Sequence, residues 1–367
     1  MQKLTSVFSQ NSTLDCREYG NALEALRGYL PTVPRQDIRG FFTRAAELSE
    51  ELPVQMREAL ADFRANGNED GYLLIRGLPV DQSTLPPTPD HWRVPVERPL
   101  LQMEAWIALI GMRMGVATGY AENRGGAVFQ DVFPARDKEA MTAAAHSMSA
   151  HGHEAMLRWH TEMAYLQEQP NYLAIGCSRA DHDRVAKTPI VSIRKIISKL
   201  SEEHREILRT VPLPWHVDAA FQSEADPDPM TNLLLLSDND DILCYDGGLI
   251  IPEEVEKAGE EFGYKKFHNE NRAKEFGRKT REALETFTEM ANEMATELYL
   301  EPGDIVLIDN LRTAHARTRF KPRWDSPVND NRWLNRIFIR TPGVGHDPEL
   351  EHAEVVRFKI REPHQPR

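Results

Sequence analysis

Five histidines in this sequence are each followed, two positions later, by a carboxylate. The pairs are His160/Glu162, His204/Glu206, His216/Asp218, His268/Glu270 and His352/Glu354. In an extended segment, side chains i and i+2 lie on one face, so each pair can offer two ligands to one metal ion. Two histidines and one carboxylate form the facial triad that holds Fe(II) and leaves other coordination positions open for a co-substrate and dioxygen. One such pair alone is a common pattern and decides nothing.

The surrounding sequence separates these pairs. His204 and His268 lie in charged segments with a helical pattern, where side chains i and i+2 diverge, and His352 lies in a polar C-terminal segment. We interpret these three as solvated surface histidines. His216 stays open as a ligand, because its segment can be extended and is partly apolar. His160 is the better candidate, because it follows a tryptophan and precedes a predicted strand.

A second histidine ligand is predicted at His315. The dipeptide Pro302-Gly303 predicts a turn, Ile305–Ile308 predicts a buried strand, and His315 follows in the polar segment beyond it. Five arginines come next: Arg317, Arg319, Arg323, Arg332 and Arg336. A guanidinium can bind the carboxylate of an acid in bidentate fashion, but a basic surface strand would explain the same residues. The spacing alone does not choose between these interpretations.

The N-terminal part of the chain, which must support these residues, is predicted to be mainly helical. Helices are predicted over residues 36–66, with a new segment opening at Pro53, and over Leu101–Met114. Between them, Gly71–Gly77 is a short apolar run bounded by glycines, which predicts a buried strand.

From Leu173 onwards the pattern changes to short strands and turns. Strands are predicted at Tyr172–Gly176, Pro189–Ile193, Leu233–Leu236, Ile242–Tyr245, Ile305–Ile308 and Leu334–Ile339. Two charged helices, Ser201–Arg209 and Asn269–Leu298, interrupt them. This order predicts an all-β sandwich or barrel decorated by helices.

Composition excludes several classes of protein. The 367 residues, of which 41% are hydrophobic, can bury a large core, which excludes fibres and wholesale disorder. A net charge of -13 repels nucleic acid and anionic membranes. No apolar run is long enough to span a membrane and no signal pattern is present, so we expect a cytoplasmic protein. Its three cysteines, Cys16, Cys177 and Cys244, lack CxxC spacing and are expected to be reduced.

Several ordered landmarks carry a family resemblance. They are Gly71–Pro79, Phe129–Pro134, His160-Thr-Glu162, Ala174–Asp181, the strand into His315, and Arg332–Arg336. Over roughly residues 71–342 the chain resembles the clavaminate synthase-like group of Fe(II)- and 2-oxoglutarate-dependent oxygenases, within the taurine-dioxygenase-like superfamily. Within that group it resembles in particular the asparagine, arginine and lysine hydroxylases.

The resemblance implies a mainly β, α+β fold, with a double-stranded β-helix core (a cupin-like jelly roll) flanked by helices. It implies a single oxygenase domain over residues 1–367. In it we expect a helical part at 1–70, the core at 71–342 with a helical insertion around 250–298, and a polar surface tail or oligomer arm at 343–367. A homo-oligomer is compatible with the sequence.

The resemblance also implies the cofactor site. By this similarity His160, Glu162 and His315 bind iron, while Arg332, assisted by Thr188, binds the distal carboxylate of 2-oxoglutarate. The reaction expected is hydroxylation of an unactivated C–H bond by O2, coupled to decarboxylation of 2-oxoglutarate to succinate and CO2.

The expected substrate is a free, basic L-amino acid. The resemblance places its α-carboxylate at Arg336, its α-amino group at Gln130 and its side chain at Asp246, and it counts Glu162 among the substrate-binding residues as well. Some arginine-specific relatives use two acidic residues in the region of Asp246. The glycine at 248 removes a candidate for the second acid, which favours lysine here. The alternative interpretation of Asp246-Gly-Gly is a simple turn with solvated acids around it.

Other functions stay open at this stage. A non-catalytic metal-binding jelly roll and a hydrolytic metalloenzyme would use the same ligands, and desaturation or a neutral or carrier-bound amino acid would fit the same site. The sequence also departs from the family pattern twice. The segment between His315 and Arg332 is about three residues longer than usual, and the region 250–297 is expanded and partly helical.

Overall fold

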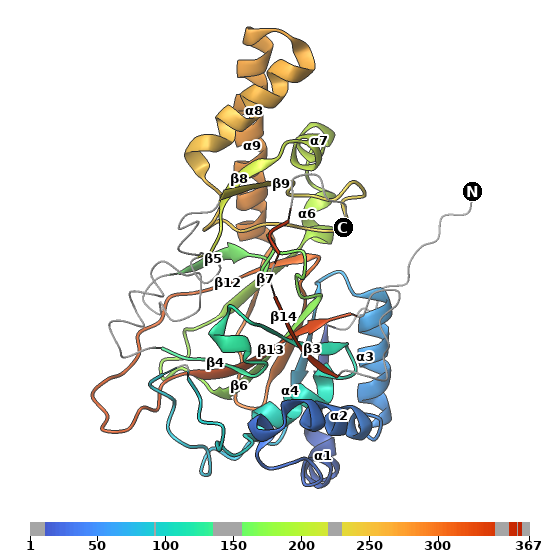
Figure 1. The fold of residues 1–367 in the computed structure, drawn as a ribbon, viewed down its shortest axis with the longest axis vertical. Coiled ribbons are helices and arrows are strands. Elements are labelled where there is room, and N and C mark those ends of the chain that lie inside the picture. The colour runs from blue at the N-terminus through green and yellow to red at the C-terminus, as the bar shows by residue number, and fades with distance from the viewer. Residues whose placement is uncertain are drawn as a thin grey trace, which may run out of the picture.

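The computed structural model describes residues 12–91, 93–134, 156–218, 230–341, 352–357 and 359–361. It has a mixed α/β fold built around one large and one smaller β-sheet (Figure 1). The helices are α1 (Gly20–Arg27), α2 (Ile38–Ser49), α3 (Val54–Asn66), α4 (Gln102–Gly111), α6 (Ile193–Ile197), α7 (Glu202–Thr210), α8 (Pro252–Phe267) and α9 (Glu270–Met294). The strands are β1 (Thr13–Asp15), β2 (Tyr72–Arg76), β3 (Val116–Tyr120), β4 (Gln130–Val132), β5 (Leu157–His160), β6 (Tyr172–Arg179), β7 (Thr188–Ser192), β8 (Leu213–His216), β9 (Met230–Leu233), β10 (Thr296–Leu298), β11 (Ile305–Asp309), β12 (Thr313–Arg317), β13 (Trp333–Arg340) and β14 (Ala353–Val356).

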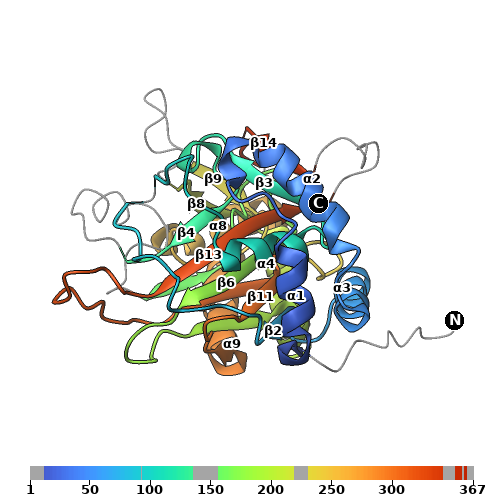
Figure 2. The ribbon, with the colours of Figure 1, turned by 90° about the horizontal axis from the view of Figure 1, so that it is seen from below.

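The large sheet has eight strands, in the order β1-β2-β11-β6-β13-β3-β14, with β4 also paired to β13. Its central strands are buried on both faces, so neighbouring side chains alternate between two cores. Leu73 and Ile75 pack against helices α1 to α4, whereas Leu74 belongs to the core on the opposite face. Figure 2 shows these helices lying across one face of the sheet.

The smaller sheet is antiparallel and has the order β10-β7-β12-β5. Its apolar residues share a core with the second face of the large sheet and with helix α9, through Ile190, Val191 and Phe287. The helical hairpin α8–α9 projects from this side of the molecule (Figure 1). The layers therefore run from α1–α4, through the two sheets, to α9.

The helix predictions are confirmed where the sequence supplies a start signal. Pro53 is the N-cap of α3, separating it from α2, and the Ser201 side chain accepts the backbone N–H of His204 at the start of α7. The predicted helix Asn269–Leu298 is wrong at its end, because α9 stops at Met294 and Thr296–Leu298 pairs with β7 as β10.

Five of the predicted strands are confirmed as β2, β6, β7, β11 and β13, and the predicted turn before β11 has Gly303 at φ +91. Two predicted strands are wrong. The run Leu233–Leu236 leaves β9 at its first residue, and Ile242–Tyr245 forms only an isolated bridge between Leu236 and Leu243. Both runs are buried over the core as irregular segments. Their apolar side chains therefore indicate burial and not membership of a sheet.

The expectation of a surface tail at 343–367 needs correction for its described part. Residues Ala353–Val356 form β14, which pairs in parallel with β3 and extends the large sheet. The burial of this strand fits an edge strand, because only Ala353 is buried and Val355 is exposed.

Two further expectations concern the whole chain. Among the helices that the structure describes, none is both long and apolar enough to cross a membrane. Cys16, Cys177 and Cys244 are buried and none forms a disulfide.

Candidate active site

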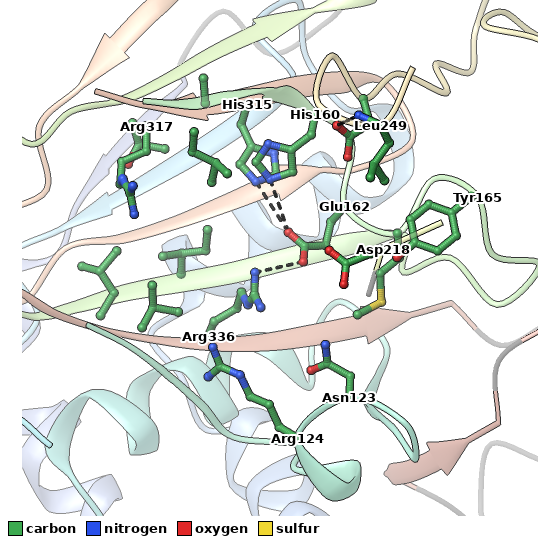
Figure 3. Close-up of a pocket in the computed structure, with 18 of the residues that line it drawn as sticks. Asn123, Arg124, His160, Glu162, Tyr165, Asp218, Leu249, His315, Arg317 and Arg336 are labelled. Atoms are coloured by element: carbon green, nitrogen blue, oxygen red, sulfur yellow. Dashed lines mark hydrogen bonds and ion pairs between the residues drawn. The ribbon is translucent and has the colours of Figure 1, made fainter. Parts of the chain in front are cut away.

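A pocket lies between the two larger sheets (Figure 3). The large sheet contributes Ile175, Leu334 and Arg336 to its wall, and the smaller sheet contributes His160 and His315. The pocket therefore combines side chains from strands that are far apart in the sequence.

His160, Glu162 and His315 meet in this pocket. His160 and His315 are direct partners in the antiparallel pair β5–β12, which places their rings on one face with centroids 4.2 Å apart. The Oε2 atom of Glu162 lies 3.6 Å from Nε2 of His160 and 3.8 Å from Nε2 of His315. One ligand atom from each residue can be chosen so that all three lie within 4.8 Å of one another.

Hydrogen bonds outside the cluster orient two of its three residues, His160 and Glu162. The Nδ1 atom of His160 lies 2.9 Å from the carbonyl oxygen of Arg158, so it donates there and leaves the Nε2 lone pair directed at the cluster. The Asn310 side chain accepts the backbone N–H of Glu162 at 2.9 Å and donates to its carbonyl at 3.0 Å. Asn310 was not singled out by the sequence, since a buried amide that holds a turn has no pattern of its own.

The donor set fits a divalent metal ion. Burial lowers the pKa of His315, with His160 lowering it further, so this imidazole is neutral and able to bind a metal. Burial would raise the pKa of Glu162, but the Arg336 guanidinium and His160 outweigh it and hold that pKa below its usual range. Burial would lower the pKa of His160, but its hydrogen bond to Glu162 and the charge of that carboxylate outweigh this effect and raise that pKa.

Arg336 and Gln130 lie beside Glu162, as the resemblance implied. They are direct partners in the pair β4–β13. The Nη2 atom of Arg336 donates to Oε1 of Gln130 at 2.7 Å, and its Nη1 atom lies 3.0 Å from Oε1 of Glu162. In Figure 3 Arg336 points at Glu162, with Asn123 and Arg124 below it. A carboxylate bound by Arg336 would thus lie next to the candidate metal ligands.

Arg332 and Thr188 line another part of the pocket, together with Arg317. The guanidinium carbons of Arg317 and Arg332 each lie 5.6 Å from the centre of the Phe320 ring. Burial lowers the pKa of Arg317 to about 10, and the charge of Arg332 contributes. In the described part of the chain no carboxylate forms an ion pair with Arg332. The sequence marks Arg317 only as one of five arginines, although its i+2 spacing from His315 predicts that the two side chains share one face of the strand.

Asp246 lies beside the candidate metal ligands, in an isolated antiparallel bridge with His160. Its Oδ1 atom accepts the backbone N–H groups of Gly248 at 2.8 Å and Leu249 at 3.2 Å, so the turn interpretation holds in part. Burial raises its pKa to about 7, although His160 opposes the shift. The residue therefore both shapes a turn and lines the pocket.

The structure brings a second acid, Asp218, into the same pocket. It is buried, and its charge contributes to raising the pKa of Asp246. Asp218 belongs to the pair His216/Asp218, which the sequence left open. Of this pair, Asp218 lines the pocket and His216 does not.

The other histidine pairs are separate from the site. His204 lies on α7, His268 is the left-handed C-cap of α8, and His352 precedes β14. Of the residues described, only His160, Glu162 and His315 form a cluster with the geometry of a metal site.

Comparisons with known proteins agree with the family resemblance that the sequence motifs carry. A family model described as "Taurine catabolism dioxygenase TauD, TfdA family" matches residues 41–338. The chain is 41% identical over 352 residues to clavaminate synthase 2 of Streptomyces clavuligerus, covering 95% of this chain and 98% of that protein.

Two solved structures show that the fold is shared. Asparagine oxygenase in complex with Fe(II), 2S,3S-3-hydroxyasparagine and succinate aligns with a TM-score of 0.72 and 23% identity, over 94% of this chain and 100% of that one. The non-heme iron oxygenase OrfP in complex with Fe and alpha-ketoglutaric acid aligns with a TM-score of 0.65 and 22% identity, over 90% of this chain and 94% of that one.

Proposed function

Since this chain belongs to the TauD/TfdA family, in its clavaminate synthase-like group of Fe(II)- and 2-oxoglutarate-dependent oxygenases, we propose that it hydroxylates a free L-amino acid with a cationic side chain. The observation that carries this proposal is the convergence of His160, Glu162 and His315 in one buried pocket with arginines and acids around it.

We assign the two facing sheets to a double-stranded β-helix core. The large and small sheets enclose the pocket between them, which is the arrangement that a jelly roll provides. Residues 1–367 would form one oxygenase domain, with a helical part at 1–70 and the core at 71–342, to which β14 of the C-terminal segment adds an edge strand. Helices α8 and α9 would form its insertion at 250–298.

Each end of the pocket has its own role. His160, Glu162 and His315 would hold Fe(II), and Arg332 with Thr188 would bind the distal carboxylate of 2-oxoglutarate. When bound, the metal and this co-substrate supply the oxidising power for C–H hydroxylation by O2. The protein's own task is to hold the C–H bond of the substrate in position and to exclude water.

The amino-acid end of the substrate fits the second group of residues. Arg336 would bind the α-carboxylate, and Gln130 and Glu162 would accept hydrogen bonds from the α-ammonium. The existing contacts of Arg336 with Gln130 and Glu162 support this, because they already hold the guanidinium at the metal ligands.

The side-chain end is acidic. Asp246 and Asp218 line the pocket together, and two carboxylates would compensate the burial of a substrate cation. Asp218 supplies the second acid that glycine at 248 could not, which removes the reason for preferring lysine. A guanidinium, which can bind carboxylates in bidentate fashion, is the better fit, so we propose arginine or a similar guanidino amino acid.

The direct test of the oxygenase function is spectroscopic. Anaerobic protein loaded with Fe(II) and 2-oxoglutarate is expected to give a weak visible metal-to-ligand charge-transfer band. A protein that binds the metal without this band would be a sensor, a scaffold or a hydrolytic metalloenzyme. Screening free amino acids for substrate-dependent succinate formation, with product mass as the readout, would then identify the substrate.

The variant Asp246→Asn is expected to lower kcat/KM for the cationic substrate more than tenfold, which corresponds to about 1.4 kcal/mol or more. Asparagine keeps an Oδ1 acceptor for the turn amides of Gly248 and Leu249, so the change removes mainly the charge. The measurement is kcat/KM for arginine, for lysine and for a neutral amino acid. Unchanged selectivity, or a wild-type preference for neutral or carrier-bound amino acids, would contradict the role of Asp246.

A further inference from the structure

The residues next to His160 and Asp246 face away from the pocket and toward helix α9. Trp159 precedes His160, and Tyr245 precedes Asp246. The backbones of the two segments are joined on both sides of the His160–Asp246 bridge: the N–H of Thr161 donates to the carbonyl of Tyr245 at 2.6 Å, and that of Gly247 donates to the carbonyl of Trp159 at 2.9 Å. Successive side chains of an extended segment point to opposite faces, so the neighbours of the two pocket residues point outward.

Two polar side chains of α9, Asn292 and Thr288, form hydrogen bonds with Trp159 and Tyr245. Nε1 of Trp159 donates to Oδ1 of Asn292 at 2.8 Å. The hydroxyls of Tyr245 and Thr288 lie 2.9 Å apart, and the Thr288 hydroxyl also lies 2.9 Å from the carbonyl of Leu284. Because a threonine hydroxyl has one hydrogen, which it donates to that carbonyl, the Tyr245 hydroxyl is the donor to Thr288.

The two contacts are one helical turn apart. Thr288 and Asn292 are in i, i+4 positions and therefore lie on the same face of α9. The residues that directly precede them, Phe287 and Ala291, are fully buried, and the Phe287 ring packs on Tyr245 with centroids 5.0 Å apart. A Cβ atom at Gly247 would lie 3.0 Å from the Tyr245 hydroxyl, so the glycine lets the ring lie across the bridge.

Helix α9 is itself held closely by α8. A Cβ atom built at Gly259 would lie 2.3 Å from Oγ1 of Thr280, and one at Gly277 would lie 2.6 Å from the carbonyl oxygen of Glu256. These positions must stay small for the two helices to approach, so the hairpin is a tightly packed pair. A tightly packed pair can hold a strand in place better than a loop can.

From these contacts we propose that Thr288 and Asn292 are positioning residues, through which the helical insertion fixes Asp246 and His160 in the pocket. Thr288 acts on Asp246 through Tyr245, and Asn292 acts on His160 through Trp159. The insertion thus sets where the side-chain end of the substrate lies relative to the metal. This inference rests on the proposed roles of Asp246 and His160.

The test for Thr288 compares Thr288→Val with Thr288→Ser. Valine has nearly the same shape but cannot accept the Tyr245 hydrogen bond, whereas serine can. Thr288→Val is expected to raise KM for the amino-acid substrate about fivefold, as loss of one hydrogen bond allows, and Thr288→Ser to restore it. The Kd of 2-oxoglutarate, measured anaerobically from the charge-transfer band, should stay within about twofold because Arg332 and Thr188 are untouched.

Tyr245→Phe removes the same hydrogen bond from its other end. The double variant Thr288→Val/Tyr245→Phe is expected to be no worse than either single variant, since both lose one shared contact. The matched control is Glu289→Gln, an exposed position on the same turn of α9 that faces away from the pocket. It should behave as the wild type.

For Asn292, the readout is metal binding without turnover. Asn292→Leu is expected to weaken Co(II) binding to the metal-free protein about threefold, because Trp159 and thus His160 lose their anchor. Thr288→Val should leave Co(II) binding unchanged.

Each outcome has one meaning. If Thr288→Val or Tyr245→Phe lowers the unfolding temperature while KM for the amino acid stays at the wild-type value, α9 is only a structural support and the inference is wrong. Equal increases in KM for the amino acid and Kd for 2-oxoglutarate would also overturn it. A wild-type protein that binds Co(II) but gives no charge-transfer band would instead overturn the proposed function.

Discussion

Replacement of His160, Glu162 or His315 by alanine is expected to reduce turnover to the background level. Each substitution removes one of the three proposed protein ligands, and a site with two ligands cannot hold the metal in the required geometry. The measurements are succinate formation and Co(II) or Fe(II) titration of the purified variants. All three variants should lose metal binding together with activity.

The three variants should differ in stability. Glu162 forms an ion pair with Arg336, and removal of one partner of a buried pair leaves an uncompensated charge. Glu162→Ala is therefore expected to lower the unfolding temperature more than His315→Ala does. In Glu162→Gln the shape is kept while the charge is lost, which separates packing from electrostatics.

The control for this set is His216→Ala. His216 comes from the motif that competed with His160 in the sequence, but its side chain does not line the pocket. This variant should keep both iron and activity. The ligand assignment would be wrong if His216→Ala lost iron while His160→Ala retained iron and turnover.

Substitution of the two pocket arginines is expected to give separate phenotypes. Arg332→Ala should raise the 2-oxoglutarate requirement, and Arg336→Ala should mainly weaken the amino-acid substrate. Each loses a charge-assisted contact worth about 1.5–3 kcal/mol, or roughly 10- to 150-fold in affinity. The measurements are KM for each substrate and the Kd of 2-oxoglutarate from the charge-transfer band.

Two controls accompany the arginine variants. Arg336 also contacts Glu162, so metal affinity must be measured on Arg336→Ala before its KM is interpreted. Arg340→Ala removes a guanidinium from the end of the same strand, where it pairs with Glu354 away from the pocket, and should leave both KM values unchanged. Reversed phenotypes would mean that the longer segment between His315 and Arg332 has shifted the register.

The local parts of the site could be predicted from the sequence because their signals are local. The spacing of His160 and Glu162, the turn at Pro302-Gly303 before β11, and the four-residue step from Arg332 to Arg336 are all set within one segment. Strands β2, β6 and β11 were predicted for the same reason, since a short apolar run between turn residues is buried wherever it occurs.

The misplaced elements have a common physical cause. The runs 233–236 and 242–245 are as apolar as true strands, but apolarity reports burial and not pairing. Whether such a run joins a sheet depends on an available strand edge, which other parts of the chain supply. Thr296–Leu298 illustrates this dependence: it pairs with the edge of β7 and forms β10, although the sequence pattern predicts the end of a helix.

By itself, the sequence determined which residue types and spacings were present, and through them the oxygenase family and a short set of ligand candidates. The tertiary structure decided which candidates meet. Pairing of β5 with β12 brings His315 to His160 across 155 positions of sequence, and the loop after β8 brings Asp218, but not His216, into the pocket. These choices depend on strand register and on the packing of the two sheets against each other. Both are set by contacts between segments distant in the chain, which no local pattern encodes.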